Sequence, residues 1–401
     1  WRIGQESFMQ GIDYISNLKL RVSYGIVGEQ GVPAYNSLSR FTPYVTFLNN
    51  QVSNAVLLEN LASSNLDWET TTQTDIGLEI GFLNNRYSLE LDYYNKRTKD
   101  LLLNRPIPGT AGETRLENVG EIENKGFEFT INSLNIDKPD FTWSTNLTIS
   151  ANKNKVISIG DGQEFITLDN PNGSSGPSIR IIPGYPAPAY LGATYLGTYR
   201  TTAEIDADGV VGSVLGGPRY VDLDGNGAIN QLDFIVHGDP NPDFYGGLRN
   251  TLTYKDFTLD FFFHGSYGNE ILNAAYHLGY FGRDPRSNLL PIVKDRWTTS
   301  NQNSDIPRAG SSFGNYQQRS DVSYQDGSFL RLKNVTLTYD LDIPGMKRAS
   351  VYVTGNNLLL FTKFTHGDPE QSNYGDGLAQ GVANGGYPYN SSFALGFNLT
   401  L

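Results

Sequence analysis

The sequence contains no cysteine, so neither a disulfide framework nor a thiolate metal site can stabilise this chain. It also lacks any uninterrupted apolar run of the roughly 18 residues that a membrane-spanning helix needs. The mean hydropathy of −0.37 agrees with that absence. Together these features exclude a helical membrane protein. They leave a membrane barrel open, because only alternate side chains of a barrel strand are apolar.

Basic residues are scarce. Lys and Arg number 30 against 42 Asp and Glu, which gives a net charge of −12 and argues against nucleic-acid binding. The four histidines lie far apart, without the spacing of zinc ligands. The chain begins at Trp1, with neither an initiator methionine nor a signal peptide. We therefore expect a processed product or part of a longer protein.

What the sequence does contain is a two-residue alternation of apolar and polar side chains. It holds 24 Tyr, 21 Phe and 43 Gly, a mixture that favours strands joined by many turns. In the last block, 393–401, every large apolar residue occupies an odd position and every small or polar residue an even one. Such a segment predicts a strand with one apolar face.

The alternating blocks come in pairs joined by short turns, which predicts antiparallel hairpins. In the pair 76–82 and 87–93, a turn at Asn84–Arg86 separates the strands, and the second face carries carboxylates. These are Asp75, Glu79, Glu90 and Asp92. Further turns are predicted at 137–140, 255–256 and 344–345, and a phase slip before Val335 predicts a bulge near Asn334. With strands at 18–24 and 393–401, the count is roughly ten.

The predicted connections differ in length at the two ends of the strands. Long connections alternate with the short turns and cover 27–68, 98–123, 152–243, 265–327 and 361–390. Outer-membrane barrels sort their connections in this way, with short periplasmic turns and long external loops, whereas soluble sandwiches rarely do. The predicted fold is an all-β, transmembrane antiparallel β-barrel with long extracellular loops, of which 152–243 is one.

Several short motifs resemble the SusC/RagA group of TonB-linked outer-membrane proteins, and they follow that family's order along most of the chain. They are Asn65–Thr71, Asp92–Asn95, Lys99–Leu101, Asn118–Gly120 with Asn124–Phe129, Asp239–Asp243, Asp305–Arg308 and Gly327–Asn334. The resemblance implies a 22-stranded barrel, of which residues 1–401 are the C-terminal part. We expect this chain to contain no counterpart of the family's N-terminal plug or of its TonB-contacting segment.

The resemblance also implies a function, which is import of oligosaccharides or peptides through the outer membrane of a Gram-negative bacterium. The expected partners are a SusD-like surface lipoprotein, the TonB complex acting through parts outside this chain, and outer-membrane lipid. Ten strands of so large a barrel have two open edges, so we expect the plug and the remaining strands to come from elsewhere.

Residues 222–233 have the spacing of a calcium loop. Oxygen-bearing residues occupy positions 1, 3, 5, 7, 9 and 12, and glycine occupies position 6, where the loop must turn sharply. The predicted ligands are Asp222, Asp224, Asn226, the Ala228 carbonyl, Asn230 and Asp233. The alternative is a turn rich in Asp, Asn and Gly that binds nothing. A calcium ion here would have a structural role.

Four tyrosines of the same connection could stack on sugar rings or contact a partner, or could simply pack within the loop. They are Tyr185, Tyr190, Tyr195 and Tyr199. A glycosidase pair among Glu79, Glu90 and Asp92 is a weaker interpretation than a hydrated lumen wall. No nucleophile elbow, P-loop or dinucleotide fingerprint is present, so we expect no enzyme. The rival function is a calcium-stabilised surface or secreted adhesin that binds glycans without transport.

Overall fold

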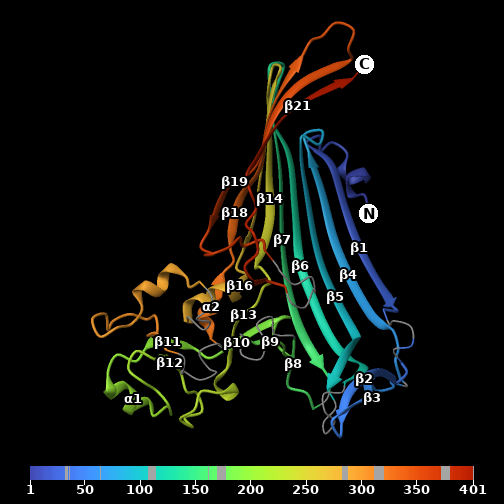
Figure 1. Cartoon of the computed structure of the whole chain (residues 1–401). Helices are drawn as coiled ribbons and strands as arrows, with labels where there is room; N and C mark the ends of the chain where they lie inside the picture. The colour runs from blue at the N-terminus through green and yellow to red at the C-terminus, as the bar shows by residue number, and fades with distance from the viewer. Residues whose placement is uncertain are drawn as a thin grey trace.

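A ten-stranded antiparallel sheet forms the main body of the protein (Figure 1). The structure, a computed structural model, describes residues 1–31, 35, 37–63, 65–106, 114–160, 162–168, 178–281, 288–310, 320–371 and 380–400. In spatial order the strands are β1 (Ile15–Glu29), β4 (Glu69–Phe82), β5 (Tyr87–Pro106), β6 (Thr114–Lys138), β7 (Phe141–Ile159), β14 (Phe244–Tyr254), β15 (Phe257–Tyr267), β18 (Phe329–Leu341), β19 (Arg348–Thr362) and β21 (Ser392–Thr400). The predicted antiparallel sheet is confirmed, and β1 and β21 form its edges.

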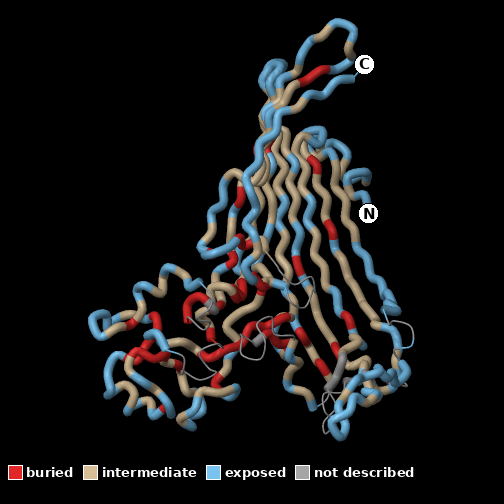
Figure 2. Tube along the Cα trace, viewed as in Figure 1, coloured by how far each residue is buried: buried red, intermediate tan, exposed pale blue. Residues whose placement is uncertain are grey.

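One face of this sheet is apolar across its whole width. The strand register aligns large side chains into continuous rows, and one row runs through Leu18, Ile80, Leu89, Ile131, Leu147, Leu248, Phe263 and Leu332. Side chains on this apolar face are open, with Val22 67% and Phe397 71% exposed. Figure 2 shows most of the sheet as intermediate or exposed. An exposed apolar face of this extent fits a sheet that faces lipid.

Short turns join the strands at the end that we call the turn end. Between β4 and β5 the backbone is left-handed at Leu83, Asn84 and Asn85, with φ of 50°, 58° and 59°. Asparagine tolerates this conformation better than most residues, which explains the predicted turn. The turns at 255–256 and 344–345 are confirmed as well. The predicted bulge is also present, since both partners of β18 shift register around Lys333, next to Asn334.

At the opposite end of the strands, which we call the loop end, the predicted boundaries of the connections were wrong. Residues 98–123 were expected to form a loop, but β5 continues to Pro106 and β6 starts at Thr114, and the two pair along this length. Similarly, β7 extends to Ile159, so the connection predicted as 152–243 begins at residue 160. These extensions carry polar and charged side chains on both faces. They lack the alternation that reveals a strand with one face in lipid.

The described parts of the long connections fold into a loop-end assembly. It contains β8 (Ile166–Thr167), β9 (Ser178–Ile181), β10 (Ala189–Gly192), β11 (Tyr195–Thr198), α1 (Thr202–Asp208), β12 (Pro218–Tyr220), β13 (Ile235–Gly238), β16 (Glu270–Asn273), α2 (Ala274–Phe281), β17 (Tyr324–Asp326) and β20 (Val382–Ala383). Among the described residues, three short 3-10 helices accompany them, at Gln231–Asp233, Pro291–Asp295 and Asp321–Ser323. Two more lie in the N-terminal segment, at Ile3–Gln5 and Ser7–Met9. Within the connection between β1 and β4, β2 (Arg40–Leu48) and β3 (Gln51–Asn60) pair as a separate hairpin.

Three long connections share one buried core in this assembly. Ile179, Tyr190, Leu272 and Val382 pack together, each fully buried, although they come from connections far apart in sequence. Figure 2 shows the buried residues gathered at this end of the molecule. No helix among the described residues is long and apolar enough to cross a membrane.

Candidate functional site

The polar face of the sheet carries the four predicted carboxylates, and β1 supplies cations that pair with three of them. Arg21 lies 2.6 Å from Glu90 and 3.0 Å from Asp92, and Lys19 lies 3.0 Å from Glu79. The side chain of Ser23 donates to Asp75. The carboxylates are therefore members of a charged network on a strand wall, which favours the interpretation as a hydrated lumen surface over a glycosidase pair.

Side-chain amides continue this polar face on β6 and β7. Asn146 donates to Asn132 over 2.7 Å, and Asn154 donates to Asn124 over 2.8 Å. The two residues of each pair lie opposite each other on neighbouring strands. Polar side chains bonded to one another across strands form a wall that water can wet, as the interior of a barrel requires.

The four candidate tyrosines have different surroundings. Tyr190 is fully buried, stacks on Tyr324 at a centroid distance of 5.1 Å and donates to the Gly381 carbonyl. Tyr199 is 1% exposed. Tyr195 packs among aromatic rings such as Tyr280 and donates to the Asp305 carbonyl. Packing within the loop thus accounts for these three, and the buried side chains of Tyr190 and Tyr199 expose almost no surface to a ligand.

Tyr185 remains open, with 44% of its surface exposed. Its carbonyl accepts from the Val156 amide at the end of β7, so the backbone of this residue is fixed against the wall. Of the four tyrosines, it is the one whose ring can reach a ligand without rearrangement.

The predicted calcium loop brings three carboxylates together. Oxygens of Asp222, Asp224 and Asp233 lie within 4.8 Å of one another. Asp233 is fully buried and accepts from the backbone amides of Leu223 and Asn230, at 2.8 and 2.7 Å. These bonds close the loop around the carboxylates.

Glycines shape the turn that places Asp222. Gly225 and Gly227 have φ of 68° and 76°, and their amides donate to Asp222 over 2.9 and 2.8 Å. Donation by the Gly227 amide, followed by the other amides of the turn, lowers the pKa of Asp222. The remaining predicted ligands bond internally: the side chain of Asn226 accepts from the Ala228 amide, and the Ala228 carbonyl accepts from Asn230. The oxygens that converge are therefore those of the three aspartates.

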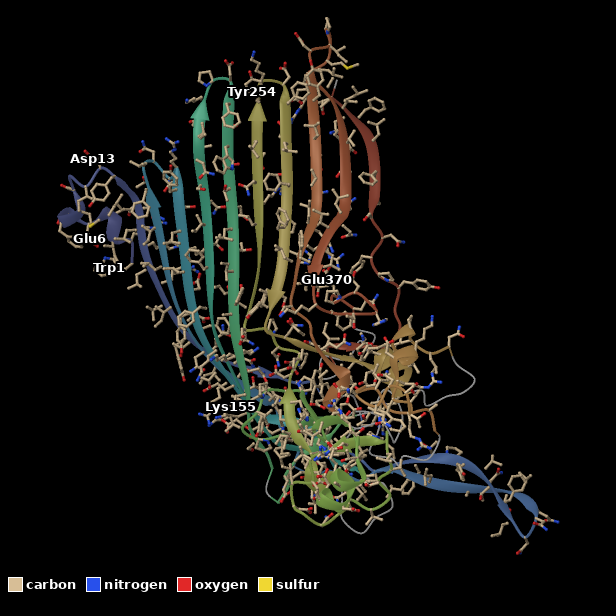
Figure 3. All side chains as sticks on the ribbon, turned by 90° about the vertical axis from the view of Figure 1, so that its left-hand side faces the viewer. Trp1, Glu6, Asp13, Lys155, Tyr254 and Glu370 are labelled. Carbon is tan, nitrogen blue, oxygen red and sulfur yellow. The ribbon has the colours of Figure 1, made fainter. Side chains whose placement is uncertain are left out.

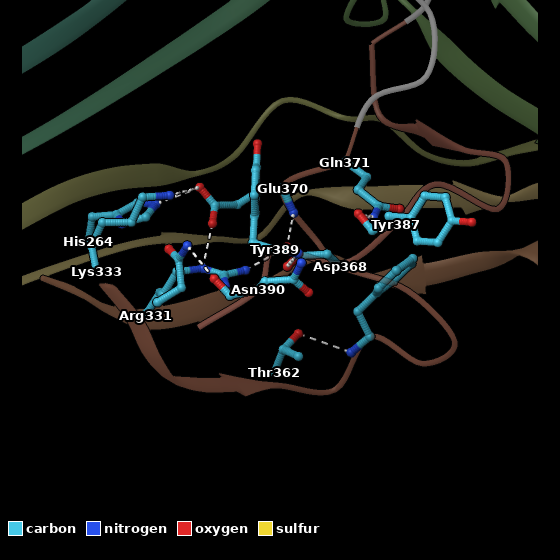
Figure 4. A network of polar contacts seen from close by, with 12 residues as sticks. His264, Arg331, Lys333, Thr362, Asp368, Glu370, Gln371, Tyr387, Tyr389 and Asn390 are labelled. Carbon is cyan, nitrogen blue, oxygen red and sulfur yellow. Dashed lines mark hydrogen bonds and ion pairs between the residues drawn. The ribbon is translucent and has the colours of Figure 1, made fainter. Parts of the chain in front are cut away.

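A buried ion cluster that sequence reasoning missed joins the connection after β19 to the polar face of the sheet (Figure 4). Arg331 on β18 is 2% exposed and lies 2.5 Å from both Asp368 and Glu370. Glu370 also contacts His264 at 2.8 Å and Lys333 at 3.5 Å. The motif Gly327–Asn334 contains Arg331, but nothing local indicates partners more than 30 residues away.

Glu270 occupies the start of β16 beside the motif Asp239–Asp243. Its amide donates to the Asp239 carbonyl over 2.9 Å. Burial, together with the nearby carboxylates of Asp239 and Asp326, raises the pKa of Glu270 to about 7. This carboxyl therefore changes charge near neutral pH, at the junction between the sheet and the loop-end assembly.

Comparison with known proteins identifies the family. A family model described as TonB dependent receptor-like, beta-barrel matches residues 6–358. The chain belongs to this TonB-dependent receptor family. It is 39% identical over 411 residues to TonB-dependent receptor P26 of Formosa agariphila. It is 27% identical over 422 residues to TonB-dependent receptor SusC of Bacteroides thetaiotaomicron. Both alignments cover 100% of this chain, but 41% and 39% of the relatives.

A solved structure has the same fold. The chain superposes on the RagAB peptide transporter with a TM-score of 0.80 at 24% identity, covering 100% of this chain and 42% of that one. These findings confirm the resemblance to the SusC/RagA group, the β-barrel fold and the outer-membrane location. The family is one of receptors and transporters rather than of enzymes. The chain spans about two fifths of the length of these relatives.

Proposed function

We propose that the whole protein imports oligomeric nutrients, oligosaccharides or peptides, across the outer membrane. In this proposal TonB supplies the energy, and a SusD-like lipoprotein covers the loop end from outside the cell. The observation that carries the proposal is a polar sheet face that leads into a folded loop-end assembly, on a sheet whose other face is apolar. Such a wall can line a wet passage through lipid. The names of the relatives, SusC and the RagAB peptide transporter, support the same role.

The described sheet would form part of the wall of the complete importer. Its edge strands β1 and β21 would pair with further strands, because an open sheet edge is too costly in lipid. The plug and the segment that contacts TonB would belong to the remaining length that the relatives have. Family membership favours import over the rival function of a glycan-binding adhesin.

Uptake measurements test this proposal. Cells carrying the full-length receptor should accumulate labelled members of an oligosaccharide or peptide library, and a deletion strain should not. A protonophore should stop uptake while leaving surface binding intact. Purification from native membranes should recover a surface lipoprotein with the receptor. Binding without uptake would favour the adhesin, and recovery of the intact receptor from the aqueous phase without detergent would contradict a membrane importer.

We also propose that the 222–233 loop binds calcium and stiffens the loop-end assembly. The convergence of three carboxylates supports this, since calcium prefers several hard oxygen ligands. Titration of the full-length receptor with calcium should give a binding heat with a Kd of roughly 0.1–1 mM, the range of extracellular calcium modules. The double variant D222N/D224N should lose the heat. Asp206 of α1 is exposed, so D206N is the matched control and should keep it. Absence of heat from the wild type at millimolar calcium would exclude the site.

A further inference from the structure

The apolar face ends in a row of aromatic side chains near the loop end. Tyr93 pairs in register with Phe127, and Phe244 pairs with Tyr267. Their rings lie close, with centroids 4.9 Å and 5.2 Å apart. Aromatic rows of this kind occur where a barrel passes from hydrocarbon into the headgroup region. The row therefore marks the lipid headgroups at the loop end.

Immediately beyond this row, the same face becomes basic. The loop-end basic cluster consists of Arg97, Lys99, Lys125, Lys153 and Lys155 on three adjacent strands, each of them exposed. Two carboxylates lie among them. Glu121 pairs with Arg97, and Glu123 pairs with Lys125 over 3.0 Å. Five cations and two carboxylates leave an excess of three positive charges, in a chain whose net charge is −12.

The unpaired lysines of this cluster point away from the interior. Among the described residues, neither Lys153 nor Lys155 has an ion pair. The alternate residues of β7 pack inward instead: Val156 is buried against Ile181, and Asn154 accepts from the Ala187 amide. Figure 3 marks Lys155 at the loop end of β7, far from Tyr254 at the turn end. The lysines are therefore free to meet a ligand that approaches through the membrane.

An apolar recess lies beside this cluster, on the hydrocarbon side of the aromatic row. It arises because Gly246 and Gly265 pair in register, in a row that continues to Ile149 on one side and Leu330 on the other. A Cβ on Gly246 would lie 2.2 Å from the Thr148 carbonyl oxygen, so a side chain is sterically excluded there. The recess has a volume of about 790 Å³. Its lining is mainly apolar, which suits an acyl chain.

We propose that this face is a binding site for a membrane lipid whose phosphate-bearing headgroup has a net negative charge. The acyl chain occupies the recess beside Gly246, and the phosphate contacts Lys153 and Lys155. Ile149 and Lys153 are four residues apart on one strand, which corresponds to about 13 Å from recess to headgroup at 3.3 Å per residue. Both halves of an anionic lipid thus find complementary chemistry at the depth where the aromatic row places the headgroups.

Native mass spectrometry of the detergent-purified full-length receptor tests the site. The probes are monophosphoryl lipid A, phosphatidylglycerol, zwitterionic phosphatidylcholine and inorganic phosphate. We expect the two anionic lipids to bind, and the zwitterionic lipid and free phosphate to bind far more weakly. Each lysine near an anionic headgroup contributes about fivefold in affinity, so K153Q/K155Q should lose about 25-fold. The control K138Q/K255Q removes the same charge from exposed lysines at the turn end and should bind like the wild type.

A second variant separates the acyl contribution from the charge. L330W places a bulky ring at the wall of the recess without altering a charge, and it should weaken binding of long-chain lipids several-fold while the lysines stay intact. Equal binding by K153Q/K155Q and the wild type would overturn the proposal, as would an equal loss in the turn-end control. If the substitutions dissociate a receptor dimer and release no lipid, a second copy of the receptor occupies this face and the proposal is wrong. None of these outcomes depends on cargo import.

Discussion

Replacement of Arg331 by methionine is expected to destabilise the loop-end assembly by about 3–5 kcal/mol. The guanidinium lies 2.5 Å from both Asp368 and Glu370, and Arg331 and Asp368 are almost completely buried. Methionine has a similar length but no charge, so R331M leaves two carboxylates facing each other with poor access to water. Of the two carboxylates, His264 and Lys333 pair with Glu370 and not with Asp368, so neither replaces the arginine at Asp368.

Hydrogen exchange of the full-length receptor would measure this effect. The described part of the connection between β19 and β21 should exchange much faster in R331M than in the wild type. The matched control is R200M, which removes an arginine whose pair with Asp305 is largely exposed, and it should cost at most about 1 kcal/mol. The triple variant R331M/D368N/E370Q removes the buried charges together and should recover part of the loss. If the connection between β19 and β21 were equally protected from hydrogen exchange in R331M and R200M, the cluster would have no structural role.

The sheet could be predicted from the sequence because its signals are local. A strand with one face in lipid must alternate, and a short turn requires residues such as Asn84 that tolerate a left-handed backbone. The bulge beside Asn334 was predictable for the same reason. Leu330 and Leu332 share the apolar face with Val335 only if one residue is inserted between them, and that residue is Lys333.

The loop-end assembly could not be predicted in this way, because its contacts join distant parts of the chain. Tyr190 was predicted as a possible ligand contact, but its ring is buried against Tyr324, which lies in another connection. Arg331 likewise gains its role from Asp368 and Glu370, which approach only once the chain after β19 folds back. The extensions of β5 and β6 were not predicted for a different reason. A strand that has no face in lipid needs no alternation of apolar and polar side chains.

The calcium loop lies between these two cases. Its turn follows from local spacing, and the structure brings Asp222, Asp224 and Asp233 together through bonds within the loop itself. The spacing did not reveal that Asn226 and the Ala228 carbonyl would bond internally. Calcium binding therefore stays a prediction, carried by three of the six residues proposed as ligands.

The orientation of the sheet in the membrane predicts opposite outcomes for two adjacent phenylalanines. Phe261 lies on the apolar face, between Asn250 and Val335 in register, and Phe262 lies on the polar face, between Arg249 and Asn334. Both occupy the middle of β15, midway between the aromatic side chains at its two ends. F261R should therefore place a charge near the centre of the bilayer, at a cost of about 2–4 kcal/mol.

F262R is the matched control, because it introduces the same charge at the same depth but on the side that faces the lumen. The substitution removes the packing of the Phe262 ring on Gly247, but water can surround the new guanidinium. We therefore expect it to lower the free energy of unfolding by about 1 kcal/mol or less. Guanidinium unfolding of the full-length receptor in phospholipid vesicles would measure both costs. A larger loss in F262R than in F261R would mean that the apolar face does not face lipid. The expected order requires that the row through Leu248 and Phe263 touches hydrocarbon while the carboxylates and amides behind it touch water.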